Sequence, residues 1–183
     1  MEYGLRTLKQ ENTFSKMTKA KNLNTNRVEW YTPKEVVDHF APSDGFQYDP
    51  CTTDAQAAYL GIPHYDTKDT DGLTTDWFNY DSIWINPPFD HKAEFLKKAV
   101  DTYLNGESYI CVLLPIEFLT TVKFHKIISP VAGDYFLHIP NGRIKFIGGA
   151  GASSPAFGSV VIELGTKSGG LKHLRLDGET DTK

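Results

Sequence analysis

The chain has 183 residues, 40% of them hydrophobic and 23% charged, which is typical of one soluble globular domain. It has no membrane-length apolar run, no signal-peptide core and no metal-type spacing of its two cysteines, so we expect a reduced, cytoplasmic protein without a metal. The formal charge of −4 gives no overall attraction to nucleic acid.

The first segment, residues 1–26, is polar and only weakly periodic. Through Arg27 it carries six basic residues against two acidic ones, a local excess of four positive charges. We expect a flexible basic arm, which either contacts nucleic acid or is simply a disordered terminus. The compact domain is expected at residues 27–165, followed by a short extension at residues 166–183.

A helix is predicted to open at the sequence Thr-Pro-Lys-Glu of residues 32–35. Thr32 is a good N-cap, Pro33 fits the first helical position, and Glu35 completes a capping box. The apolar face of this helix comprises Val36, Val37 and Phe40. This local role alone would explain both Thr32 and Pro33.

Residues 46–50 predict the first central strand, which Pro50 stops. Thr52 or Thr53 caps a short helix that ends at Gly61, and residues 62–65 predict a second short strand. An acidic loop then precedes Trp77, with Asp66, Asp69, Asp71 and Asp76. We expect one of these carboxylates to bind a ligand and the others to be solvated.

The most informative stretch is Ile-Trp-Ile-Asn-Pro-Pro-Phe-Asp, residues 83–90. A strand runs into two prolines, which end it in a stiff corner, and Asp90 is expected to cap the helix that follows. Ligands bind at this edge of open parallel sheets. The Asn86 oxygen and the Pro87 carbonyl can accept both hydrogens of an exocyclic amine while Phe89 stacks on its ring. The alternative is an ordinary strand–helix junction with an incidental Pro-Pro pair.

The remaining elements alternate between helices and strands. A helix around residues 96–104 ends at Asn105-Gly106, a buried strand follows at 109–114, and a helix is expected at 117–128. Final strands are predicted at residues 135–139 and 159–164, with a short extra strand after Gly165. This pattern predicts a three-layer α/β sandwich with a mostly parallel sheet.

Two more features bear on the site. The segment between the last two strands holds Arg143 and Lys145 beside a Gly/Ala/Ser-rich loop, and these side chains, together with Lys92, are candidates for contacts with phosphates or base edges. The three tryptophans, Trp30, Trp77 and Trp84, are all expected in the site region.

The corner Asn-Pro-Pro-Phe resembles the catalytic motif of amino-group methyltransferases that use S-adenosylmethionine. The order and spacing of further motifs resemble the small phage and prophage DNA N6-adenine methyltransferases over residues 30–164. These motifs are Trp30-Tyr31-Thr32-Pro33, Asp49-Pro50-Cys51, Asp71-Gly72-Leu73, Trp77, Leu113-Leu114-Pro115 and Gly142-Arg143-Ile144-Lys145-Phe146.

The resemblance implies a Rossmann-like methyltransferase fold with a reversed final hairpin, S-adenosylmethionine as cofactor and double-stranded DNA as partner in a bacterial host. It implies that Asn86, Pro87, Pro88 and Phe89 form the catalytic corner. The cofactor pocket is expected to involve Tyr31, Thr32, Pro33, Asp49, Pro50, Cys51 and Asp71. The usual Gly-x-Gly loop is missing, and the oligomeric state, monomer or weak dimer, stays open.

Other activities remain possible on this sequence. Pro50-Cys51 also resembles the nucleophile of cytosine-C5 methyltransferases, but those enzymes have a glycine-rich loop and no Asn-Pro-Pro-Phe, so we expect Cys51 to line the pocket. Related corners act on cytosine N4, RNA adenine or protein glutamine. Cytosine-N4 enzymes typically have Ser or Asp in place of Asn86, which favours adenine. A catalytically inactive nucleic-acid-binding module is the alternative from a different class.

Overall fold

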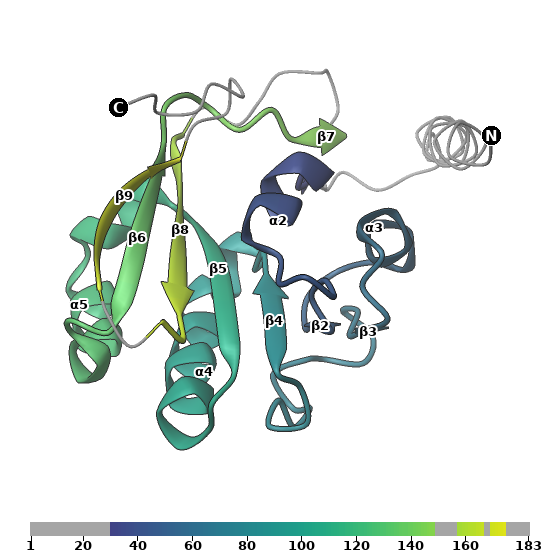
Figure 1. Ribbon diagram of the computed structural model, residues 1–183, viewed down its shortest axis with the longest axis horizontal. Coiled ribbons are helices and arrows are strands. Elements are labelled where there is room, and N and C mark those ends of the chain that lie inside the picture. The colour runs from purple at the N-terminus through teal and green to yellow at the C-terminus, as the bar shows by residue number, and fades with distance from the viewer. Residues whose placement is uncertain (1–29, 149–156, 167–168, 175–183) are drawn as a thin grey trace.

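The computed structural model describes residues 30–148, 157–166 and 169–174, so the predicted arm at 1–26 lies outside the described residues. Figure 1 shows a central sheet with helices packed on it. The strands are β1 (Trp30–Tyr31), β2 (Tyr48–Asp49), β3 (His64–Tyr65), β4 (Ser82–Ile85), β5 (Tyr109–Pro115), β6 (Tyr135–Pro140), β7 (Ile147–Gly148), β8 (Ser159–Leu164) and β9 (Gly170–Leu174). The helices are α2 (Lys34–Phe40), α3 (Asp54–Leu60), α4 (Lys92–Asn105) and α5 (Val122–Ile128), with short 3₁₀ turns η1 (Phe89–His91), η2 (Ile116–Thr120) and η3 (Ser129–Val131).

Seven strands form the main sheet in the order β3-β2-β4-β5-β8-β6-β9. β3, β2, β4 and β5 run parallel to one another, and β9 runs parallel to β6. Only β8 is reversed in this sheet, because it is antiparallel to both β5 and β6. The mostly parallel sheet and its reversed final hairpin are therefore confirmed.

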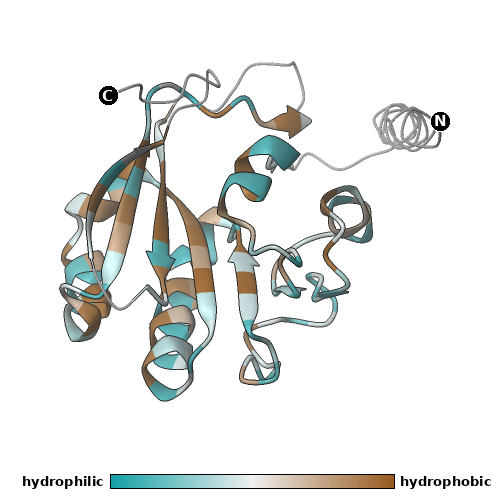
Figure 2. Ribbon diagram, viewed as in Figure 1, coloured by the Kyte–Doolittle hydropathy of each residue, from teal (hydrophilic) through white to brown (hydrophobic). Residues whose placement is uncertain are grey.

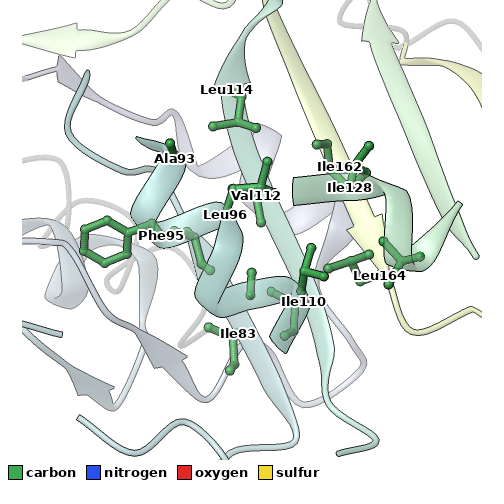
Figure 3. Close-up of a cluster of buried hydrophobic side chains, with 14 of the residues drawn as sticks. Ile83, Ala93, Phe95, Leu96, Ile110, Val112, Leu114, Ile128, Ile162 and Leu164 are labelled. Carbon is green, nitrogen blue, oxygen red and sulfur yellow. The ribbon is translucent and has the colours of Figure 1, made fainter. Parts of the chain in front are cut away.

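Alternate side chains of β5 face opposite layers of helices. On one face, Ile110, Val112 and Leu114 are buried with Leu96 of α4 and Ile128 of α5 (Figure 3). This alternation is the period of two that a strand imposes on its side chains. Each large aliphatic side chain buried in this way contributes roughly 1.5–3 kcal/mol to the stability of the fold.

The other face of the same strands carries a second core. Cys111 and Leu113 of β5 pack there with Trp84 of β4 and with Val37 and Phe40 of α2. Figure 2 shows hydrophobic residues along the central strands and hydrophilic ones over the outer surface of α2. Two helical layers thus enclose one sheet, which confirms the three-layer α/β sandwich.

The tryptophans correct one expectation. Trp77 and Trp84 are 1% and 0% exposed, so both side chains belong to the core. Trp77 also supports the Asp71 loop, because its Nε1 donates to the Gly72 carbonyl at 2.8 Å. Phe40 stacks against Trp84 at a ring-centroid distance of 6.1 Å, and Phe46 packs against it at 5.6 Å with the rings tilted by 52°. Trp30 is half-buried in the small sheet formed by β1 and β7 and directly precedes Tyr31 and Thr32.

The structure corrects three predicted helix starts. The Pro88 carbonyl accepts from the His91 N–H at 3.0 Å, and this bond makes η1, so α4 begins at Lys92 and Asp90 caps nothing. The helix expected at 117–128 is interrupted at Thr121, whose side chain accepts from the Phe124 N–H at 3.1 Å and caps α5. The predicted Thr32 cap is also wrong: Pro33 is the N-cap of α2, without a side-chain hydrogen bond.

Candidate active site

The carboxyl ends of β2 and β4 bring the predicted site segments together. The two strands are direct neighbours, with Tyr48 opposite Ile83, so Asp49 and Asn86 end adjacent strands on one edge of the sheet. The segment leading to Thr32 reaches the same edge from β1, which pairs with β7. Residues from distant parts of the sequence therefore converge at this edge (Figure 1).

Asn86 is fixed by Thr32. The Asn86 Nδ2 donates to Thr32 Oγ1 at 3.1 Å across 54 residues of sequence. The Asn86 Oδ1 lies at the opposite end of the amide from this bond, and the Pro87 carbonyl precedes Pro88, which has no N–H. Two acceptors thus remain at the corner, as the two hydrogens of an exocyclic amine require.

Phe89 follows the two prolines and is 45% exposed. Phe157, which the sequence analysis did not single out, meets its ring edge-on at a centroid distance of 4.8 Å and 84°. The Lys92 Nζ donates to the Phe89 carbonyl at 2.6 Å and lies 5.4 Å from the Phe118 ring. Lys92 therefore supports the turn at the corner, and a role in DNA contact stays a prediction.

Asp49 is a buried carboxyl, 2% exposed, at the end of β2. Its Oδ1 accepts from the Cys51 N–H at 3.0 Å. Burial raises the pKa of this carboxyl to about 7, although the hydrogen bond from Cys51 acts in the opposite direction. A carboxyl with such a pKa ionises readily when a cation lies beside it, so its chemistry fits the cationic methionine end of S-adenosylmethionine.

Cys51 is in contact with both Asp49 and the backbone of Asn86 at the corner. Burial, followed by the Asp49 charge, raises the pKa of the Cys51 thiol well above its usual value, while the Asn86 backbone N–H bonds to the sulfur. A nucleophilic cysteine needs the opposite shift, because the thiolate is the reactive form. This environment favours the role of a pocket wall.

The Asp71 loop is held against the Asp49–Cys51 segment. Asp71 has a left-handed φ of 53°, and its Oδ1 accepts from the Leu73 N–H at 3.2 Å. A Cβ on the next residue, Gly72, would lie 2.0 Å from the Pro50 carbonyl oxygen, so only glycine permits this approach. Asp71 is thereby placed next to the end of β2 with its other carboxylate oxygen available.

Lys98 of α4 anchors this loop, and the sequence analysis missed it. Its Nζ donates to the carbonyls of Leu73 at 2.7 Å and Gly72 at 3.2 Å, and also to that of Thr75. The available signal was its position three residues after Phe95, on the buried side of α4. Burial lowers the pKa of Lys98, which the Asp76 and Asp71 carboxylates partly offset.

Asp66 is a structural carboxylate. Tyr48 donates to it in a short hydrogen bond, and the Thr75 hydroxyl donates to the same oxygen at 2.6 Å. Burial works against ionisation of Asp66, but these hydrogen bonds hold its pKa below the usual range. Asp66 is thus occupied within the fold, unlike Asp71.

Arg143 and Lys145 lie on the segment that leads from β6 into β7. Both side chains are exposed, and Ile144 between them is buried in the core that α2 covers. β7 pairs Ile147 with Tyr31, so the basic segment passes beside the strand that delivers Thr32. The predicted contact residues therefore border the same edge as Asn86.

The described residues hold no group of His, Cys, Asp and Glu suited to a metal and no helix long and apolar enough to cross a membrane.

Solved structures share this fold at low identity. A protein of Vibrio vulnificus YJ016, described as "a modification subunit of a putative type I restriction enzyme", superposes with a TM-score of 0.57 at 14% identity, covering 94% of this chain and 51% of its own. The chain thus spans about half the length of that subunit. At this identity the likeness shows the fold alone.

Two further structures match at a TM-score of 0.40, too low to support an argument. They are a "predicted O-methyltransferase" from Agrobacterium tumefaciens, at 10% identity over 74% of this chain and 69% of its own, and a "putative class i s-adenosylmethionine-dependent methyltransferase" from Listeria monocytogenes, at 14% over 69% and 46%. No curated protein matches the chain.

Residues 19–160 match the sequence model of the family described as DNA N-6-adenine-methyltransferase (Dam). This match covers most of the 183 residues and includes the corner, the Asp49–Cys51 segment, the Asp71 loop and the basic segment. The chain belongs to the DNA N-6-adenine-methyltransferase (Dam) family.

Proposed function

We propose that this protein methylates the N6 amine of adenine in double-stranded DNA, with S-adenosylmethionine as the methyl donor. The observation that carries the proposal is the arrangement of Asn86. Its amide nitrogen is bonded to Thr32, which leaves its oxygen and the Pro87 carbonyl as acceptors at the edge of the sheet. Family membership supports adenine as the base.

The Asn86 oxygen and the Pro87 carbonyl act on the amine by accepting hydrogen bonds from its two N–H groups. These hydrogen bonds keep the lone pair localised on nitrogen, where it is nucleophilic. Because the amine is paired inside the duplex, the adenine must be extruded from the stack, and the exposed Phe89 offers a ring for it to stack on. The protein's contribution is positioning and polarity. No side chain has to serve as a general base, because the amine nitrogen becomes acidic once it is methylated and releases its proton to water.

Bound S-adenosylmethionine supplies an electrophilic methyl group on sulfur. In this chain, the buried Asp49 carboxyl suits the cationic end of that molecule, and the second Asp71 oxygen suits hydroxyl groups. Tyr31, Thr32, Pro33, Pro50 and Cys51 complete the proposed pocket. Their convergence on the same edge as Asn86 supports this assignment.

DNA contacts are proposed for the exposed Arg143 and Lys145, with Lys92 and the basic residues 1–26 as further candidates. A small number of local contacts suits a chain whose net charge is −4, since affinity depends on the phosphates that are neutralised locally. We also propose that the methyltransferase domain extends over residues 27–165.

The test uses purified protein, unmethylated plasmid DNA and S-adenosylmethionine, with mass spectrometry of the digested DNA. N6-methyladenine is expected for the wild type. Asn86→Ala should lower turnover by about 100-fold or more, as expected when one preorganised polar group is lost, while Asn79→Ala, an exposed turn position, serves as the matched control.

The other activities give distinct results in the same assay. Detection of N4-methylcytosine or 5-methylcytosine would show that the target base is cytosine and not adenine. Methylation of RNA or of a glutamine peptide, but not of plasmid DNA, would replace DNA as the substrate. Binding of S-adenosylmethionine without any transfer would indicate an inactive module.

A further inference from the structure

A chain of hydrogen bonds leads from α3 to the corner. The Gln56 Nε2 donates to the Thr32 carbonyl at 2.9 Å, and the Asn86 Nδ2 donates to the Thr32 hydroxyl at 3.1 Å. Gln56 lies 24 residues after Thr32, and Asn86 lies 54 residues after it. One residue therefore receives hydrogen bonds on both its backbone and its side chain from two separate elements of the fold.

Thr32 is enclosed on all sides. It is 1% exposed and Gln56 is 5% exposed, so neither has ready access to water. Thr32 is not needed for the start of α2, because the Pro33 carbonyl receives the Val36 and Val37 N–H groups and no side chain caps the helix. The Thr32 hydroxyl is therefore not used as a helix cap and accepts the hydrogen bond from Asn86.

An asparagine amide can face a target with either of two ends of nearly equal shape. One end has two donors, and the other end is an acceptor. A donor end facing an amine would repel its hydrogens, whereas the acceptor end can hold them. Since the Nδ2 of Asn86 is bound to Thr32, the Oδ1 is the end directed away from it.

We propose that Thr32 is a positioning residue that sets the orientation of the Asn86 amide, and that Gln56 fixes Thr32 for this task. The proposal rests on the function proposed above, because it concerns the reaction at Asn86. It gives Thr32 a role in the rate of transfer that is separate from lining the cofactor pocket. Gln56 contributes only through Thr32.

The test compares Thr32→Val, which keeps the shape but removes the hydroxyl, with Thr32→Ser, which keeps the hydroxyl. Thr32→Val should lower kcat about 10-fold, as expected for one lost hydrogen bond, and leave KM for DNA nearly unchanged. Thr32→Ser should recover most of the loss. Thr102→Val, an equally buried threonine on α4, is the matched control and should behave like the wild type.

Calorimetric titration of each variant with S-adenosylmethionine gives a readout independent of turnover. Thr32→Val keeps the shape of the side chain at the pocket wall and removes only the hydroxyl bonded to Asn86, so its affinity should be close to that of the wild type. A reduced affinity with unchanged kcat would overturn the proposal, because Thr32 would then act on the cofactor. Equal losses of kcat in the Val and Ser variants would also overturn it, because packing and not the hydroxyl would be responsible.

Gln56→Met tests the second link. Alone it should lower kcat by a few-fold, and combined with Thr32→Val it should add almost nothing, since residues that act through one another are not additive. Additive losses would remove Gln56 from the proposal. If the wild type itself does not methylate DNA, the proposed function fails; if it does and Thr32→Val is equally fast, only the present proposal fails.

Discussion

Asp49 carries a charge-dependent cost to stability that Asp49→Asn should remove. Burial raises the pKa of this carboxyl from 3.8 to about 7. Between those values the folded protein holds a proton that the unfolded chain has lost, so stability falls as the pH rises through this interval and then levels off. A shift of roughly three pKa units corresponds to a cost of about 4 kcal/mol above neutral pH.

The assay is urea unfolding of wild-type protein and Asp49→Asn near pH 5 and near pH 8. The asparagine oxygen can still accept the Cys51 N–H bond, so the variant loses the titration and keeps the contact. Relative to the variant, the wild type should lose roughly 2–3 kcal/mol of unfolding free energy between the two conditions. Groups that titrate alike in both proteins cancel in this comparison.

The same substitution should weaken S-adenosylmethionine binding, because a neutral amide cannot pair with a cationic ligand. Calorimetry should therefore find the weaker binder in the protein that is more stable near pH 8. For the wild type, affinity should rise with pH up to about 7, since binding favours the ionised carboxyl. Identical pH dependence of unfolding in the two proteins would refute this reasoning.

Four further predictions concern the site and the proposed DNA contacts. Phe89→Ala should weaken activity by an amount equivalent to roughly 1–3 kcal/mol of base stacking, while Phe89→Tyr should retain it in the same turnover assay; a fully active Ala variant would show that the base is held elsewhere. Cys51→Ser should keep most activity and yield no 5-methylcytosine by mass spectrometry, and any 5-methylcytosine formed by the wild type would point to a cysteine nucleophile. Deleting residues 1–26 should lower the slope of log affinity against log salt by about 0.9 per lost phosphate contact, with binding followed by fluorescence anisotropy. Arg143→Ala should instead cost roughly 1–3 kcal/mol on the preferred sequence only, if it reads a base edge; an equal loss on random DNA would make it a phosphate contact.

The sequence was most informative where one local rule acts alone. The continuous apolar run at residues 109–114 became β5, buried on both faces, because only a central strand needs apolar residues at every position. The short helix α3 has Thr53 as its N-cap and Gly61, with a φ of 78°, as its C-cap, as the sequence predicted. The corner at Asn86 also lies where its two prolines placed it, directly after β4.

Predictions failed where a tertiary contact competes with a local one. Thr32 has the right side chain for a helix cap, but its hydroxyl bonds to Asn86, which no local pattern could indicate. Gln56, Lys98 and Phe157 were missed for the same reason, since their partners lie far away in the sequence. The pairing of β1 with β7 depends on two-residue strands, which leave too short a pattern to recognise.

The contact between Gly72 and Pro50 limits how this protein can diversify. Any side chain at Gly72 would collide with the Pro50 carbonyl, because even a Cβ would lie 2.0 Å from it. Substitutions there would push the two loops apart before adding any new interaction. In a mutant library selected for altered cofactor preference, tolerated changes should accumulate at Asp71 and Leu73, whereas Gly72 should remain glycine in every active clone.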